Sequence, residues 1–217
     1  MQFYLPSMDN QIDFPDVDEA LSEPNGLLAF GGNLQSETLL KAYSHGIFPW
    51  YSDQEPILWW APDPRMVLYP DKFHVSKSFN RFLKKIPYQV HLNRDFESVI
   101  DICSETRKDG LGTWITDEMK QAYIKLHMQG KAHCLEIDIA GKLAGGIYGV
   151  ALDKVFYGES MFSRQTNGSK IALLELCKYM QKNDYKILDC QVHSDHLESL
   201  GAELIPMRVF KKYLPKN

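Results

Sequence analysis

Apolar residues recur at helical spacing in four stretches of the chain. The first runs from Ser36, a residue type that caps helix N-termini, to Gly46. The others lie around residues 79–86, between 116 and 130, and after residue 167. Because this spacing puts the apolar residues of each stretch on one side, it predicts four helices, each with one buried face.

Strand-like runs fill most of the second half of the chain. Three of them, at 133–139, 143–152 and 155–162, are joined by turns short enough for antiparallel hairpins. The helix after Asn167 and a last run at 186–193 complete the order β-β-β-α-β. A strand, helix, strand step implies a right-handed crossover and a parallel pair of strands. We therefore expect the reacting groups where the third and fourth strands separate or end.

Up to about Arg65 the chain is dense in Pro, Gly and aromatic rings, and it contains three of the four tryptophans. This composition predicts a loop-rich unit held together by the packing of aromatic rings. The rings either form the core of that unit or grip a planar ligand, and the pattern leaves both readings open. The predicted fold class is α+β, with a small N-terminal domain at 1–65 and a C-terminal domain at 66–217.

Charge is divided unevenly along the 217 residues. The net charge is −4, but residues 1–40 contain seven acids and no Lys or Arg, so the rest carries +3. A polyanionic partner is disfavoured for the first forty residues only. The best candidates for phosphate contacts are the cations of the predicted helix near residue 80, whose alternative reading is a solvated face. They are Lys77, Arg81, Lys84 and Lys85.

The sequence lacks the motifs of secreted, membrane-spanning, metal-binding and nucleotide-driven proteins. The four cysteines are spread singly and the first eight residues do not resemble a signal peptide, so we expect a cytosolic chain with reduced thiols. No apolar run approaches the ~18 residues of a membrane span. No ligand spacing supports a metal site, His193 and His196 included, and no Walker, Gly-x-Ser-x-Gly or Gly-x-Gly-x-x-Gly motif occurs.

Polar residues interrupt two of the predicted strands. By alternation, Asp189 and Gln191 share one face of the last strand with His193, and Tyr157, Glu159 and Met161 share a face of the third. If both faces line one cleft, it holds two carboxylates, an amide, a phenol and a thioether. The alternative is an exposed sheet face with ordinary polar residues.

These polar side chains suit a reaction in which the enzyme must orient the reactants more than activate them chemically. Gln191 cannot act as a base, whereas Asp189 could accept or steer a proton if burial raised its pKa. Aminolysis of an already activated ester fits, because an α-amino group of pKa ~7.7 is partly neutral at working pH and alignment is the larger obstacle.

The strand order is also that of the N-acetyltransferases that use acetyl-coenzyme A. Their pyrophosphate loop resembles [Arg/Gln]-x-x-Gly-x-[Gly/Ala], and the matching stretch here is Gln165–Lys170. Lys170 stands where the second small residue would allow a close backbone approach. A coenzyme A cofactor is therefore not expected, and a different acyl donor is needed.

Seven separated strings together resemble the leucyl/phenylalanyl-tRNA–protein transferase family, and they span residues 24–202. The resemblance implies a small N-terminal domain on a C-terminal domain similar to the GCN5-related N-acetyltransferase fold. The strings are Gly26–Asn33, Ala42–Tyr51, Ile57–Arg65, Gly112–Thr116, Gly158–Arg164, Leu188–Val192 continuing to His196, and Leu200–Ala202.

The resemblance also implies an activity and its partners. The enzyme would move Leu or Phe, less often Met, from aminoacyl-tRNA to the α-amino group of proteins with N-terminal Arg or Lys, and so mark them for N-degron proteolysis. It would be a bacterial cytoplasmic enzyme. We separately expect a monomer that uses no cofactor, metal or membrane. Two other classes stay open, an acetyl-coenzyme A enzyme and a non-catalytic tRNA- or peptide-binding module.

The family's pattern assigns roles to particular residues. Gln191 would bind the attacking amine, Asp189 would polarise Gln191, and Glu159 would lie near the acceptor's first residue. Trp50 and Trp114 would lie near the terminal adenosine of the tRNA, with core rings as the alternative. The donor side chain would enter an apolar pocket made of Ile147, Gly158, Met161, Leu173, Leu176, Met180 and Leu188.

Overall fold

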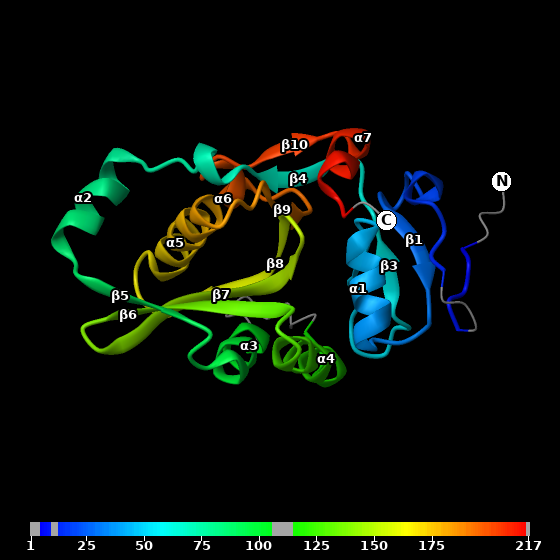
Figure 1. Ribbon diagram of the computed structural model, residues 1–217, viewed down its shortest axis with the longest axis horizontal. Coiled ribbons are helices and arrows are strands. Elements are labelled where there is room, and N and C mark those ends of the chain that lie inside the picture. Colours follow the sequence, from blue (N-terminus) through cyan, green and yellow to red (C-terminus); the bar gives the residue numbers. More distant parts are fainter. Residues whose placement is uncertain (1–4, 10–12, 106–114, 216–217) are drawn as a thin grey trace.

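The computed structural model describes residues 5–9, 13–105 and 115–215, which form two sheets. A three-stranded sheet has the order β1-β3-β2, and a seven-stranded sheet has the order β10-β4-β9-β8-β7-β6-β5. Figure 1 shows the small sheet with helix α1 at one end of the molecule and the large sheet through the remainder. The predicted α+β class is confirmed by this mixture of sheets and helices.

The small sheet combines β1 (Leu27–Phe30), β2 (Phe48–Pro49) and β3 (Leu58–Trp60) with α1 (Ser36–Ser44). The predicted helix is confirmed, but the cap position is Gln35, so Ser36 is the first helical residue. Ring packing holds this unit, as expected: Trp59 is fully buried and meets Phe14 edge-on at 4.8 Å between centroids.

The predicted β-β-β-α-β order is confirmed in the large sheet. Strands β6 (Ala132–Ile139), β7 (Lys142–Leu152) and β8 (Val155–Ser163) are antiparallel neighbours. Helix α5 (Gly168–Lys182) then leads to β9 (Ile187–Gln191), which pairs in parallel with β8. The pattern did not predict the flanking strands β4 (Arg65–Leu68), β5 (Tyr88–Leu92) and β10 (Glu203–Ile205).

Helices cover both faces of the large sheet (Figure 1). One face carries α5, and the other carries α3 (Phe96–Ser104) and α4 (Asp117–Met128). Two further predicted helices are thus confirmed, α4 with its Thr116 side chain accepting the Met119 N–H, and α2 (Lys77–Lys85). Two short helices follow β9 along the chain, namely α6 (Asp195–Glu198) and α7 (Met207–Phe210).

A β-bulge in β8 changes which side chains share a face. Tyr148 pairs with Ser160, and the next residue of β7, Gly149, pairs with Gly158, so Glu159 is the extra residue of the bulge. Tyr157 therefore belongs to the buried cluster on the α3–α4 side, whereas Met161 packs on the α5 side. The prediction that Tyr157, Glu159 and Met161 share one face is wrong for this reason.

The end of β9 departs from the alternation in a similar way. Gln191 is the last strand residue and has a φ of +58°, in the left-handed region. His193 lies beyond the strand and is exposed. The strand face predicted for Asp189, Gln191 and His193 therefore ends at Gln191.

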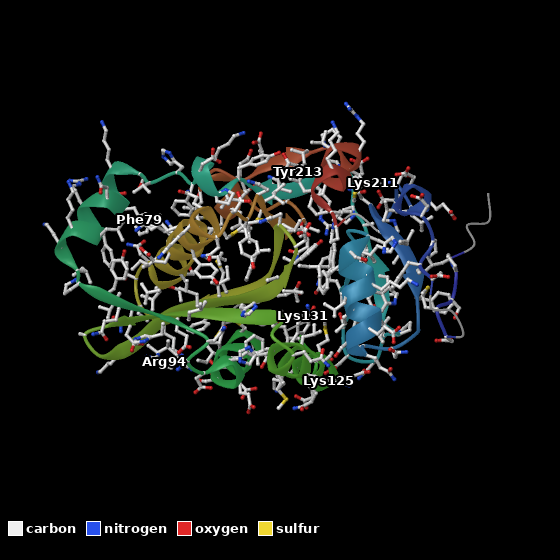
Figure 2. The ribbon with its side chains drawn as sticks, in the orientation of Figure 1. Phe79, Arg94, Lys125, Lys131, Lys211 and Tyr213 are labelled. Carbon is white, nitrogen blue, oxygen red and sulfur yellow. The ribbon has the colours of Figure 1, made fainter. Side chains whose placement is uncertain are left out.

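The buried core is continuous between the small sheet and the α3–α4 face of the large sheet. One cluster contains Leu39 and Trp59 of the small unit together with Tyr123 of α4 and Phe210 of α7. Ion pairs reinforce the contact, because Lys211, which is labelled in Figure 2, pairs with both Asp16 and Asp18. None of the helices in the described ranges combines the length and hydrophobicity of a transmembrane span.

Candidate active site

A cleft of about 490 Å³ lies where strands β8 and β9 separate. Their parallel pairing ends at Tyr157 opposite Asp189, and the next polar residues, Glu159 and Gln191, line the cleft. This is the place that the strand order predicted. The lining comes from five segments and consists of Phe48, Pro49, Trp50, Ile147, Gly158, Glu159, Ser160, Met161, Leu173, Leu188, Asp189, Cys190, Gln191, Val192, Ser194, His196 and Leu197.

Glu159 is held by hydroxyl groups from two distant helices. Tyr43 of α1 donates to Oε1 at 2.7 Å, and Tyr123 of α4 donates to Oε2 at 2.9 Å. The two tyrosine oxygens are themselves 2.5 Å apart. The side-chain amide of Gln191 reaches Oε1 at 3.5 Å, the outer limit of a hydrogen bond. The bulge thus places a carboxylate at the contact between the small unit and the large sheet.

Burial raises the pKa of Glu159 to about 7, because the ionised form loses hydration. The hydrogen bonds from Tyr43 and Tyr123 act in the opposite direction, since they stabilise the carboxylate. Burial also raises the pKa of both tyrosines well above 10, so they remain donors at neutral pH. Burial therefore brings the pKa of a carboxyl group in the cleft close to neutral pH, against the effect of its two tyrosine donors.

Asp189 is fully buried, and both its carboxylate oxygens are occupied. Nε and Nη2 of Arg65 donate to Oδ1 and Oδ2 at 2.8 and 2.7 Å. Oδ1 also accepts the backbone N–H of Gln191 at 3.0 Å. The contact from Asp189 to Gln191 is therefore made through the backbone, while the side-chain amide of Gln191 faces Glu159.

Arg65 is a residue of this site to which the sequence pattern gave no role. It is fully buried, and its guanidinium lies 4.7 Å from the ring centroid of Phe48 and 5.0 Å from that of Phe210. One signal could have found it: Arg65 opens the otherwise apolar run Arg65–Leu68, and a buried arginine needs an anionic partner.

The residues predicted for the donor pocket divide into two groups. Five of them line the cleft, namely Ile147, Gly158, Met161, Leu173 and Leu188. Leu176 and Met180 do not line it; they are 2% and 0% exposed and belong to the buried cluster on the α5 side. Members of that cluster thus form the apolar wall of the cleft, and these two residues lie in the core outside the lining.

The residues predicted for tRNA contacts lie in separate places. Trp50 lines the cleft, is 40% exposed and lies 5.6 Å from the Trp60 ring. Trp114 lies outside the described residues. The α2 cations are all exposed, and none has an ion-pair partner within the described ranges. Figure 1 shows α2 at the end of the molecule opposite the small sheet, so these cations could reach only a ligand that extends well beyond the cleft.

One group of metal-type side chains occurs in the described part of the chain, formed by His193, Asp195 and Glu198. All three are exposed, and His193 is 3.2 Å from Glu198. Exposed acidic groups of this kind are ordinary surface features, and none of the three lines the cleft.

Comparisons with known proteins agree along most of the chain. A family model described as leucyl/phenylalanyl-tRNA protein transferase matches residues 67–215, and one described as the N-terminal domain of that protein matches residues 32–63. A relative named leucyl/phenylalanyl-tRNA–protein transferase from Pseudomonas putida (strain W619) is 49% identical over 205 residues, which cover 94% of this chain and 91% of the relative. A relative of the same name from Chromobacterium violaceum is 50% identical over 204 residues, covering 94% and 88%.

Solved structures give weaker likenesses. One titled as FemX has a TM-score of 0.48 at 10% identity and covers 79% of this chain and 66% of that chain. A GCN5-related N-acetyltransferase from Kribbella flavida has a TM-score of 0.38 at 11% identity, covering 76% and 58%.

Proposed function

Because the chain belongs to the leucyl/phenylalanyl-tRNA–protein transferase family, we propose that it moves Leu or Phe, and less often Met, from aminoacyl-tRNA to the α-amino group of proteins that begin with Arg or Lys. The enzyme is an aminoacyltransferase. In this proposal it works as a cytoplasmic monomer without a cofactor. The new N-terminal residue then marks the product for N-degron proteolysis.

The proposal rests on one observation, the meeting of the Gln191 amide and the Glu159 carboxylate in a cleft with an apolar wall. A carboxylate suits a cationic acceptor, because a charge-assisted hydrogen bond is roughly twice as strong as a neutral one. Entry of an Arg or Lys N-terminus would also favour the ionised form of Glu159. Glu159 is thus our candidate for recognition of the acceptor.

The donor arrives as an already activated ester, so no separate activation step is needed. Gln191 orients the attacking amine, and Asp189 acts on Gln191 through its backbone. A new C–N bond forms as the ester C–O bond breaks, and the proton lost by the amine ends on the ribose oxygen of the departing tRNA. Alignment of amine and ester lowers the barrier to this step. The donor side chain packs against the apolar wall, including the adaptable Met161. Apolar pockets resolve neighbouring sizes by only ~1–3 kcal/mol per methylene, which fits a Leu, Phe and Met range.

The tRNA would be held at two places. The terminal adenosine would stack on Trp50 at the rim of the cleft, with Trp114 as a second ring, and each stacked base contributes ~1–3 kcal/mol. The α2 cations Lys77, Arg81, Lys84 and Lys85 would contact phosphates farther along the acceptor stem.

A transfer assay with labelled Leu-tRNA and two peptides that differ only in Arg or Ala at the N-terminus tests the proposal. We expect kcat/KM to be at least about 10-fold higher for the Arg peptide, equivalent to ~1.4 kcal/mol, and Glu159→Gln to remove most of that preference. Glu175→Gln is the matched control, since Glu175 also accepts a tyrosine hydroxyl, from Tyr88 at 2.6 Å, but lies outside the cleft lining. Equal transfer to both peptides by the unmodified enzyme would contradict the acceptor assignment.

A further inference from the structure

The contacts around Asp189 point to a residue that shapes the site without lining it. Arg65 is fully buried and absent from the cleft lining, yet both of its bonds go to the carboxylate of Asp189. We propose that Arg65 is a positioning residue of the transferase site, which fixes Asp189 and, through it, the backbone turn that presents the Gln191 amide to the acceptor. This inference rests on the proposed function and deepens it.

Asp189 depends on Arg65 electrostatically. A carboxylate with no exposed surface is very costly to bury alone, so the position of Asp189 depends on a partner cation. The Arg65 fork supplies two parallel N–H donors, which fix the distance and the plane of the carboxylate together. A lysine would supply the charge but could not reproduce this planar geometry.

Asp189 in turn fixes the backbone conformation of Gln191. Gln191 has a φ of +58°, a region that side chains other than Gly rarely occupy without local hydrogen bonds. The bond from its backbone N–H to Asp189 Oδ1, at 3.0 Å, holds it there. The same turn ends β9 and leaves the side-chain amide 3.5 Å from Glu159. The direction of the amide therefore depends on the plane in which Arg65 holds Asp189.

Two aromatic rings hold Arg65 itself in place. Its guanidinium lies between the rings of Phe48, from the small sheet, and Phe210, from the last α-helix. Arginine stacks favourably on aromatic faces, and two rings restrict rotation of the fork. The small sheet and the last α-helix thus both contact the Arg65 guanidinium next to the cleft.

The decisive experiment measures Arg65→Lys in single-turnover transfer from Leu-tRNA to an Arg peptide. We expect the rate constant at saturating substrates to fall roughly 10- to 100-fold, because small misplacements of a reacting group have effects of this size. Leu-tRNA affinity and the peptide KM should change less than about threefold, because Arg65 does not line the cleft. An unchanged rate constant would overturn the proposal.

Arg94→Lys is the matched control. Arg94 makes a similar fork to Asp138, at 2.6 and 3.0 Å, and Figure 2 shows it away from the C-terminal segment that carries Lys211 and Tyr213. This variant should lose thermal stability without losing the rate constant for transfer. A loss of rate as large as in Arg65→Lys would reduce the role of Arg65 to general stability.

Two further measurements keep the test independent of folding and of the activity assigned. The double variant Arg65→Met with Asp189→Ala removes both buried charges. Its transfer rate constant should be no lower than that of Asp189→Ala alone, since the pair acts as a unit. A fall in the rate constant equal to the product of the two single-variant falls would contradict this. Hydrogen exchange of the Gln191 backbone amide should accelerate at least about 10-fold in Arg65→Lys and not in Arg94→Lys. Unchanged exchange overturns the positioning role even if transfer is confirmed, whereas accelerated exchange in an enzyme without transfer overturns only the proposed function.

Discussion

At the scale of single residues, Glu159 shows how burial and hydrogen bonds compete. Burial raises its pKa to about 7, although two tyrosine hydroxyls stabilise the ionised form. For an acid whose pKa is higher in the folded state than in the unfolded state, folding favours the protonated form. The stability from this group is fully present below about pH 4.5, its ordinary pKa, and is lost as the pH rises through 7.

Replacing Glu159 by Gln should remove that pH dependence. Between pH 5 and pH 8 the stability of the variant relative to the unmodified enzyme should rise by about 1–3 kcal/mol. For a chain of this size, that corresponds to roughly 2–4 °C in Tm per kcal/mol. Thermal unfolding of both proteins at the two pH values measures the change.

Tyr43→Phe provides the comparison for this prediction. It keeps the carboxyl group and removes one of the two donors to it. Because the lost bond stabilised the ionised form, the folded-state pKa should rise, and the loss of stability should still begin near pH 4.5 but extend to higher pH. A Tm difference between Glu159→Gln and the unmodified enzyme that stays constant from pH 5 to pH 8 would contradict the assignment.

The sequence located these functional candidates better than it predicted their contacts. Alternation and family resemblance pointed to Glu159, Asp189 and Gln191, all of which line the cleft. Their partners could not be predicted, because Tyr43 is 116 residues from Glu159 and Arg65 is 124 residues from Asp189. Contacts at such separations depend on the packing of whole elements, which no local pattern encodes.

At the scale of elements, regular periodicity predicted well and irregular backbone did not. The β-β-β-α-β order follows from long runs with clear turns, and it is confirmed. The bulge at Glu159 and the left-handed Gln191 reverse or end the alternation, so faces predicted beyond them were wrong. Short flanking strands such as β4 and β10 carry too few residues for a pattern.

Helix α2 supports a prediction about tRNA binding. Its cations are exposed and have no ion-pair partner in the described ranges, so replacing Arg81, Lys84 and Lys85 together by Gln should lower tRNA affinity. Each lost phosphate contact should also reduce the slope of log Kd against log salt by about 0.7–0.9. Binding of Leu-tRNA over a range of salt concentrations measures both effects.

The control for α2 is a triple replacement of Lys154, Lys178 and Lys186 by Gln. These lysines also lie in the large unit, but each is paired with an acid, Asp184 or Glu175. They should therefore contribute less to a long-range attraction for phosphate. If the α2 variant keeps the unmodified salt slope, its cations are a solvated face.

At the scale of the whole molecule, the structure partly explains why acidic residues are concentrated near the N-terminus. The acidic N-terminal residues pair with cations of later segments: Asp13 with Lys41, and Asp16 and Asp18 with Lys211. Exposed pairs of this kind contribute little individually. Here they add to an apolar core that already connects the small unit to the large sheet.

That continuous core predicts a single cooperative unfolding transition, although the sequence suggested two domains. Tryptophan fluorescence reports mainly on the small unit, where Trp59 is fully buried, and circular dichroism reports on the whole chain. The two midpoints should agree within about 2 °C if the units unfold together. Leu39→Ala in α1 sharpens the test, because Leu39 is fully buried and its truncation should cost ~2–5 kcal/mol. Both signals should shift to lower temperature by the same amount. A shift of the fluorescence midpoint alone would contradict the prediction, because it would show that the small unit unfolds independently of the large sheet.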